Sequence, residues 1–237
     1  MTMRIGFDMD GVLADFEAAF RDHDRRLFGP DANDKIGEPE TEEERQAASA
    51  ADDVEAQAEG RIVQARALRR REDAVWQAIE ATPNFWATLA PLDPNAVRRI
   101  HEMMLRHRWE VFFITQRPDT QGDTVQRQTQ RWLVEQGFDL PSVLVIRGSR
   151  GAAAKALRLD YHVDDNPQNC HDVVAESSAR PILIVPGRFQ TAIASARRLG
   201  IGVTPDIGQA LDVLEQATLA RSNPTLLSRI AAMVGWK

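Results

Sequence analysis

Short apolar runs alternate with helix-like segments between about residues 91 and 205, and few folds accommodate this alternation. Each run has the length and the β-branched or aromatic content of a strand, and the near-continuous apolar character fits a sheet covered on both faces. The alternation predicts right-handed βαβ units, and therefore an α/β fold with a doubly wound parallel sheet. The predicted strands cover residues 3–7, 110–115, 142–146, 160–163 and 181–185, and the predicted helices cover 94–108, 123–137, 151–159, 169–179 and 189–200.

The first predicted strand is separated from the others by an insertion of different composition, residues 17–90. An acidic stretch (38–60) precedes an Arg-rich stretch (61–72), and alanine is frequent in both. This composition predicts a helical insertion whose acidic and basic segments pair, or a partly mobile segment. The Arg-rich run is interpreted as a solvated helix face balanced by nearby acids, in preference to a nucleic-acid patch.

The C-terminal part reads as two helices broken at Asn223 and Pro224. The last of them is amphipathic, and its apolar face either packs on the core or forms a contact in a homodimer. We therefore expect a core domain (1–16 and 91–205), a helical cap insertion (17–90) and a C-terminal helical extension (206–237). The apolar positions of the last helix are Leu226, Leu227, Ile230, Met233 and Val234.

Composition excludes several classes of function. The chain has 29 Lys and Arg and 35 Asp and Glu, a net charge of −6, which provides no overall field for nucleic acid or an anionic membrane. A single cysteine, Cys170, allows neither an internal disulfide nor a Cys-based zinc site, and we interpret it as a packing residue. No run of membrane-spanning length and no signal-peptide pattern is found, so we expect a cytoplasmic protein.

Polar residues follow several of the predicted strands at the point where each ends. Asp8 and Asp10 follow the first strand, Thr115 ends the second, and Asp164 with Asp165 follows the strand at 160–163. Ligands of open α/β sheets bind beyond the carboxyl ends of the strands, so these side chains are expected to converge there. Lys155, near a helix start, is predicted to join them.

Four carboxylates at one place repel one another unless a cation lies among them. Oxygen ligands without a His or Cys cluster suit Mg²⁺, which commonly bridges carboxylates to a substrate phosphate. His162 is a candidate ligand by proximity, but strand alternation should turn it away from its neighbours, so we interpret it as a packing residue or as a partner of the ligands.

The order of these residues resembles the haloacid dehalogenase-like (HAD) superfamily. The matching motifs are DMDGV (8–12), Thr115, Lys155 and the Asp pair at 164–165. DMDGVLADFEAAF (8–20) and TPNFWATLAPLDPNA (82–96) are similar to the 5′-deoxyribonucleotidase branch, which carries a helical cap between the first and second motifs. The resemblance implies a HAD-type Rossmann-like core with an α-helical cap inserted after the first strand.

The resemblance also implies roles in phosphoryl transfer. Asp8 is the expected nucleophile, forming an aspartyl-phosphate. Asp10 is expected to bind Mg²⁺ through its carbonyl, and its side chain to protonate the leaving oxygen and then activate water. Asp10 also separates the chain from the dehalogenase branch, which lacks a second aspartate, and Gly11 lets the backbone turn.

The remaining motif residues complete the expected site. Thr115 is expected to bind a phosphoryl oxygen, and Lys155 to offset the charge of the phosphate. Asp8, Asp10, Asp164 and Asp165 form the expected metal site, in which either Asp164 or Asp165 binds directly and the other acts through water or Lys155.

Substrate identity is expected to depend on the cap and on the residues after Thr115. Phe16 is placed to stack on a base with Phe85 or Trp86 as another wall, and the alternative for all three is ordinary core. Gln116 and Arg117 depart from the animal deoxyribonucleotidases, and Arg117 either binds a second anionic group or caps a turn.

The sequence thus favours a Mg²⁺-dependent phosphomonoesterase acting on nucleoside 5′-monophosphates. A phosphatase of sugar phosphates or other small metabolites, and a non-catalytic HAD-fold binding protein, are the alternatives.

Overall fold

The computed structural model describes residues 2–30, 54–185, 190–221 and 234. The predicted helix around 226–234 lies outside this description except for Val234, and most of the acidic stretch at 38–60 also lies outside it. The chain divides into two compact units, one formed by residues 1–16 and 84–237 and the other by residues 17–83.

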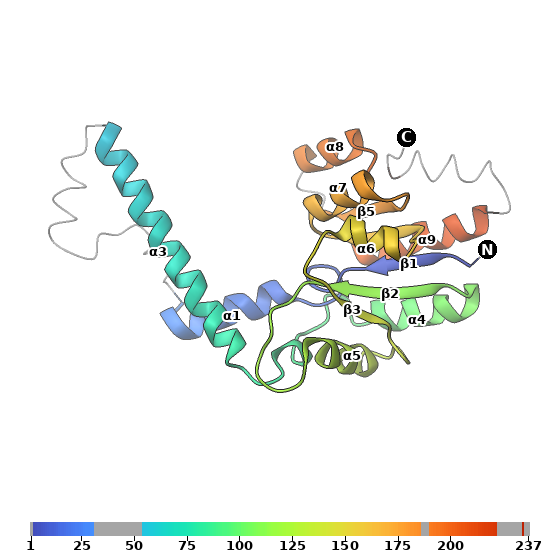
Figure 1. The fold of residues 1–237 in the computed structure, drawn as a ribbon, viewed down its shortest axis with the longest axis horizontal. Coiled ribbons are helices and arrows are strands. Elements are labelled where there is room, and N and C mark those ends of the chain that lie inside the picture. Colours follow the sequence, from blue (N-terminus) through green and yellow to red (C-terminus); the bar gives the residue numbers. More distant parts are fainter. Residues whose placement is uncertain (1, 31–53, 186–189, 222–233, 235–237) are drawn as a thin grey trace. The chain divides into compact units, whose positions relative to one another are not determined.

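The larger unit contains a six-stranded parallel sheet, which confirms the predicted doubly wound α/β fold. The strand order is β3-β2-β1-β4-β5-β6, so β1 lies in the interior of the sheet between β2 and β4 (Figure 1). The strands are β1 (Arg4–Phe7), β2 (Glu110–Thr115), β3 (Val143–Val145), β4 (Tyr161–Asp164), β5 (Arg180–Ile184) and β6 (Gly202–Thr204).

Helices cover both faces of this sheet. Helices α6, α7 and α8 lie on one face and α4, α5 and α9 on the other (Figure 1). Their bounds are α4 (Ala96–His107), α5 (Val125–Glu135), α6 (Arg150–Ala156), α7 (Pro167–Glu176), α8 (Gln190–Arg198) and α9 (Ile207–Ala220), and a short 3-10 helix, η1, covers Phe85–Ala87.

Alternation along β2 shows how the two layers form. Ile114 packs with Ala154 and Val173 from α6 and α7. Its neighbour Phe113 points to the other face, where its ring meets Phe138 edge-on at 4.9 Å. Successive side chains of a strand face opposite ways, so apolar residues at consecutive positions are buried on both sides.

The sequence missed one strand and placed α9 in a separate extension. Strand β6 pairs with β5 and adds an edge strand that was not among the predicted elements. Helix α9 lies within the larger unit and packs on α4, β5 and β6, and Arg99 of α4 donates to Asp212 of α9 at 2.5 Å.

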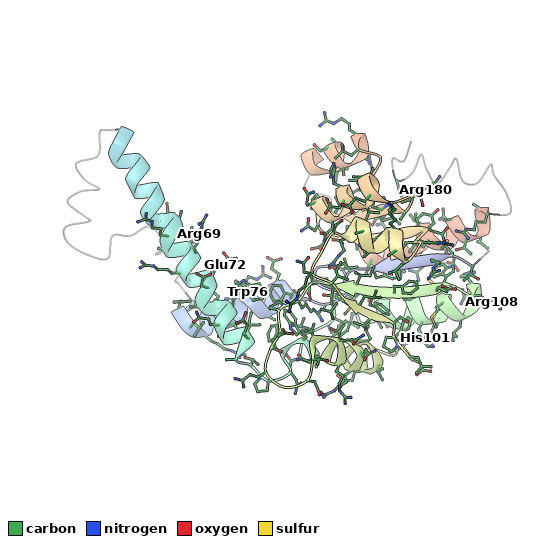
Figure 2. All side chains as sticks on the ribbon, viewed as in Figure 1. Arg69, Glu72, Trp76, His101, Arg108 and Arg180 are labelled. Atoms are coloured by element: carbon green, nitrogen blue, oxygen red, sulfur yellow. The ribbon has the colours of Figure 1, made fainter. Side chains whose placement is uncertain are left out.

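The smaller unit pairs α1 (Phe16–Phe28) with α3 (Val54–Glu80). Arg71 of α3 donates from Nε to Asp24 of α1 at 2.5 Å, and this pair is mostly buried. The Phe20 and Trp76 rings meet edge-on at 5.6 Å. Arg69 and Glu72 of the Arg-rich run are exposed on α3 (Figure 2), which agrees with a solvated helix face.

Among the described residues, the search for a helix long and apolar enough to cross a membrane finds none.

Close packing of α6 on α7 depends on Gly151. A Cβ at this position would lie 2.1 Å from the backbone oxygen of Asp172, so a side chain there would push the two helices apart. We predict that Gly151→Ala lowers the free energy of unfolding by about 1–3 kcal/mol, measured by urea denaturation.

Gly148→Ala is the matched control, because no atom of the described residues lies within 4 Å of a Cβ at that position. It should change the free energy of unfolding by no more than about 0.5 kcal/mol. Equal effects of the two substitutions would contradict this account of the helix contact.

Candidate active site

The carboxyl ends of three adjacent strands bring the predicted acids together. Asp8 directly follows β1, Asp164 ends β4, and Thr115 ends β2 on the other side. Phe7 is in register with both Phe113 and Val163, so the next residue, Asp8, lies level with Asp164. The amide of Asp8 donates to the carbonyl of Val163 at 2.9 Å, which fixes the start of the turn.

Asp8, Asp164 and Asp165 form a compact acidic cluster. One carboxylate oxygen from each lies within 4.8 Å of the others, and Asp8 and Asp164 are buried while Asp165 is exposed. Three carboxylates at these separations provide the oxygen ligands that a hard divalent cation prefers.

The turn after β1 requires glycine at position 11. Gly11 has φ +74°, and a Cβ there would lie 1.9 Å from Oδ2 of Asp165. The amides of Leu13 and Ala14 both donate to the carbonyl of Met9 and close the turn. Gly11 therefore allows the first motif and Asp165 to approach each other.

Hydrogen bonds from several donors converge on Asp164. It is 3.0 Å from Nε2 of His162, and it accepts from the Asn166 amide at 2.9 Å and from the Asn169 side chain at 3.1 Å. Burial acts to raise the pKa of Asp164, but these hydrogen bonds, chiefly that with His162, hold its pKa below the usual value. His162 thus contacts the acidic cluster through Asp164, which agrees with its interpretation as a partner of the ligands.

The pKa of Asp8 is shifted in the opposite direction from that of Asp164. Burial raises the pKa of Asp8 well above its usual value, and the charge of Asp164 raises it further, while Arg150 lowers it. Arg150 forms a buried ion pair with Asp8, and its Nε lies 3.5 Å from Oδ2 of Asp164. The other two carboxylates therefore disfavour a charged Asp8, and added positive charge would favour it.

Arg150 occupies the position expected for Lys155. It is the first residue of α6, and its side chain is 4% exposed. Lys155 lies five residues later, about 140° further around an ideal helix, and it is exposed. The structure does not bring Lys155 to the acidic cluster, and the basic residue in contact with Asp8 is Arg150.

Arg150 also retains unused hydrogen-bonding capacity. Its Nε and Nη1 are buried and have no hydrogen-bond partner within the described part of the chain. Buried donors are usually paired, so these atoms indicate the place of an anionic ligand next to Asp8.

Asp10 is paired with Arg117. The guanidinium donates to both carboxylate oxygens, from Nε at 2.8 Å and from Nη2 at 2.6 Å. The Asp10 side chain is 25% exposed, whereas that of Arg117 is 1% exposed. The Asp10 carboxylate is therefore partly exposed, and the buried guanidinium of Arg117 holds both of its oxygens.

The residues predicted to bind the substrate are found in different surroundings. Phe85 and Trp86 are each 1% exposed and belong to the core, and Phe16 is half-buried against them at ring distances of 6.4 and 5.6 Å. Gln116 is exposed on the loop after β2. Of the predicted aromatic set, only Phe16 retains exposed surface.

Thr115 and Cys170 are both buried, but their surroundings differ. Thr115 is buried at the end of β2, one residue from the loop that carries Arg117. Cys170 is fully buried, and burial, together with the nearby Asp164 charge, raises the pKa of its thiol well above the usual value. The thiol is therefore held in its unreactive protonated form, as expected for a packing residue.

Comparison with known proteins identifies the fold. No protein-family profile and no curated protein sequence matches the chain. A solved structure from Thermotoga maritima, provisionally named a β-phosphoglucomutase, is 20% identical and covers 90% of this chain and 99% of its own, with a TM-score of 0.51. The L-2-haloacid dehalogenase of Xanthobacter autotrophicus, solved with chloropropionic acid covalently bound, is 13% identical, covers 91% and 99%, and has a TM-score of 0.50. The larger unit thus has the fold of haloacid dehalogenase-like proteins, as the motifs predicted.

The charge of Asp165 generates a prediction about stability. Partial burial of its carboxyl group, and then the charge of Asp164, raise the pKa of Asp165 to about 6. An acid with a raised pKa in the folded state loses stability as pH rises from its unfolded value of 3.8 through about 6. In a chelator, Asp165→Asn should therefore raise the melting temperature above pH 7, and the gain should shrink toward pH 4.

The control is to measure the same melting temperatures with Mg²⁺ in place of the chelator. The ion should raise the melting temperature of the unchanged protein more than that of Asp165→Asn, because a ligand that binds the folded state stabilises it. A melting temperature of Asp165→Asn that parallels the unchanged protein at every pH would contradict this view of the acidic cluster.

Proposed function

We propose that this protein is a Mg²⁺-dependent phosphomonoesterase with Asp8 as its nucleophile. The observation that carries the proposal is the buried Asp8 carboxylate, which lies close to those of Asp164 and Asp165 and is paired with Arg150. Within the described residues, Nη1 of that guanidinium has no hydrogen-bond partner. A carboxylate nucleophile, an oxygen ligand set and an anion-binding group are the parts that phosphoryl transfer requires.

The charges of the site favour a divalent cation. Asp8, Asp10, Asp164 and Asp165 contribute −4 when ionised, and Arg117 and Arg150 contribute +2, so −4 + 2 leaves −2. Asp8, Asp164 and Asp165 would hold Mg²⁺, together with the backbone of Asp10. When bound, the ion would neutralise charge that otherwise repels the phosphate.

The side chains divide the reaction between them. An oxygen of Asp8 attacks phosphorus in line and forms the acyl-phosphate bond, while the bond from phosphorus to the ester oxygen breaks. Asp10 gives its proton to that leaving oxygen. It then takes a proton from water as the water oxygen attacks phosphorus, which releases inorganic phosphate and restores the Asp8 carboxylate.

Arg150 and Thr115 would stabilise the phosphoryl group. Nη1 of Arg150, which has no hydrogen-bond partner among the described residues, can donate to the phosphoryl oxygens, and Thr115 lies at the end of the neighbouring strand. Nucleoside 5′-monophosphates are the proposed substrate class, on the strength of the sequence resemblance and of the half-buried ring of Phe16.

Loss of the metal or of the nucleophile tests the proposal. Chelation should abolish hydrolysis of p-nitrophenyl phosphate, and Asp8→Asn should lower kcat by roughly 10⁴-fold or more. Far-ultraviolet circular dichroism should show that Asp8→Asn remains folded. Full activity in chelator, or in Asp8→Asn, would overturn the proposal.

A substrate panel then defines the class. Nucleoside 5′-monophosphates should be preferred, whereas a preference for sugar phosphates would redirect the assignment to that class. Chloride release from 2-chloropropionate with no turnover of any phosphate ester would instead assign dehalogenase chemistry.

Arg150 and Lys155 provide a matched pair on one helix. Arg150→Met should lower kcat for p-nitrophenyl phosphate by roughly 100-fold, because a charged donor to the phosphoryl group is lost. Lys155→Met should stay within about twofold of the unchanged enzyme. A loss confined to Lys155→Met would restore the assignment made from the sequence.

A further inference from the structure

Arg117 is held on every side by groups of the larger unit. Its Nε and Nη2 bind Asp10, its Nη1 donates to Oγ1 of Thr129 at 2.9 Å, and its guanidinium carbon lies 4.7 Å from the centre of the Trp86 ring. All three guanidinium nitrogens therefore bind protein atoms, and one face of the group lies on an indole.

The groups that hold Arg117 are themselves fixed. The Thr129 hydroxyl donates to the carbonyl of Val125 at 2.8 Å, so it is oriented to accept from Arg117. The indole of Trp86 donates to the carbonyl of Pro118 at 3.0 Å, and its amide donates to Gln128 at 3.0 Å. This network ties the loop after β2 to α5 and η1.

The two arginines of the site therefore differ in what they can bind. Among the described residues, Nη1 and Nε of Arg150 have no hydrogen-bond partner, although Nε lies 3.5 Å from Oδ2 of Asp164. Each nitrogen of the Arg117 guanidinium, by contrast, already donates a hydrogen bond. A substrate phosphate would have to displace Asp10 or Thr129 to bind Arg117. These contacts disfavour both roles that the sequence suggested for Arg117, namely binding a second anionic group and capping a turn.

We propose that Arg117 is a positioning residue that fixes the Asp10 carboxylate in the orientation needed for proton transfer. The inference rests on the proposed phosphatase function, in which Asp10 is the acid and then the base. A carboxylate has about four lone-pair sites, and the two bonds from Arg117 leave the others open on the exposed side of Asp10. A planar guanidinium fixes the plane of a carboxylate in a way that a lysine cannot.

The first test separates positioning from substrate binding. Arg117→Met should lower kcat by roughly 100-fold, at the low end of what general acid–base catalysis contributes. The KM should stay within about threefold, because no contact with the substrate is removed. Arg131→Met on the exposed face of α5 is the control and should leave both constants unchanged.

Aryl phosphates whose leaving groups differ in pKa test the proton-transfer role directly. A purely structural defect would lower the activity on every ester by a similar factor. Esters of nitrophenols need little protonation and phenyl phosphate needs much, so Arg117→Met should lose most activity on phenyl phosphate. Arg117→Lys keeps the positive charge but cannot donate two parallel hydrogen bonds to the carboxylate, so it should restore only part of the activity lost in Arg117→Met. A uniform loss across the series, or full recovery by lysine, would overturn the proposal.

A double-mutant cycle isolates the coupling between the two residues. In an Asp10→Asn background, Arg117→Met should have almost no further effect on kcat, because the group it positions is already disabled. Independent, multiplicative losses would contradict the proposal, as would a raised KM with an unchanged kcat.

A measurement without turnover separates this inference from the proposed function. The Nε–H resonance of Arg117 in a nitrogen-15 spectrum should be protected from exchange and should shift in Asp10→Asn but not in Arg131→Met. If the unchanged protein hydrolyses no phosphate ester, the proposed function fails, and the positioning role fails with it even where this shift is seen. If the protein is active and the resonance ignores Asp10, the positioning role alone fails.

Discussion

Electrostatic repulsion among carboxylates is the constraint around which the larger unit is organised. Parallel strands β1 and β4 end side by side and bring Asp8 level with Asp164, and Gly11 lets Asp165 approach the same turn. Buried like charges are costly unless they are paired or neutralised. Two buried arginines, Arg150 and Arg117, reduce that cost, and the remaining negative charge matches one divalent cation.

Both arginines offset the negative charge of the carboxylates, but their contacts differ. Arg150 begins α6 and is paired with Asp8, and within the described part of the chain its Nη1 has no hydrogen-bond partner, which is why we propose it as the group that binds the phosphate. Arg117 follows β2 and is fully engaged with Asp10, Thr129 and Trp86. Pre-organised charge of both kinds lowers the reorganisation that a developing phosphoryl charge would otherwise demand.

The sequence predicts the frame of the fold well, because most of the strands from β1 to β5 are short apolar runs, and the acids of the site follow β1 and end β4. It misses β6, a three-residue edge strand whose Gly202–Thr204 offers too short a pattern to detect. It names Lys155 as the basic residue of the site and does not identify Arg150, which begins the same helix on a different face. Ser149, which caps α6 through the Gly151 and Ala152 amides, is the signal that would have placed Arg150 at the first turn.

The surroundings of Arg117 and Trp86 could not be predicted from one sequence. Gln128 and Thr129 read as ordinary helix residues, yet both are fully buried and bind the loop after β2 and η1. Contacts between segments about 40 residues apart depend on how α5 packs, which local periodicity does not specify. The sequence leaves Trp86 as either a pocket wall or a core residue; the structure buries it in the core, where its ring also supports Arg117.

In the proposed reaction, Asp8 attacks phosphorus and carries the phosphoryl group. Acid quenching during the first turnover of a nitrophenyl phosphate, followed by digestion and mass spectrometry, tests this most directly. We expect a phosphoryl group on the peptide that contains Asp8, and none on the same peptide from Asp8→Asn treated in the same way. Rapid turnover with no phosphorylated peptide at any quench time, or with phosphate on another residue, would contradict it.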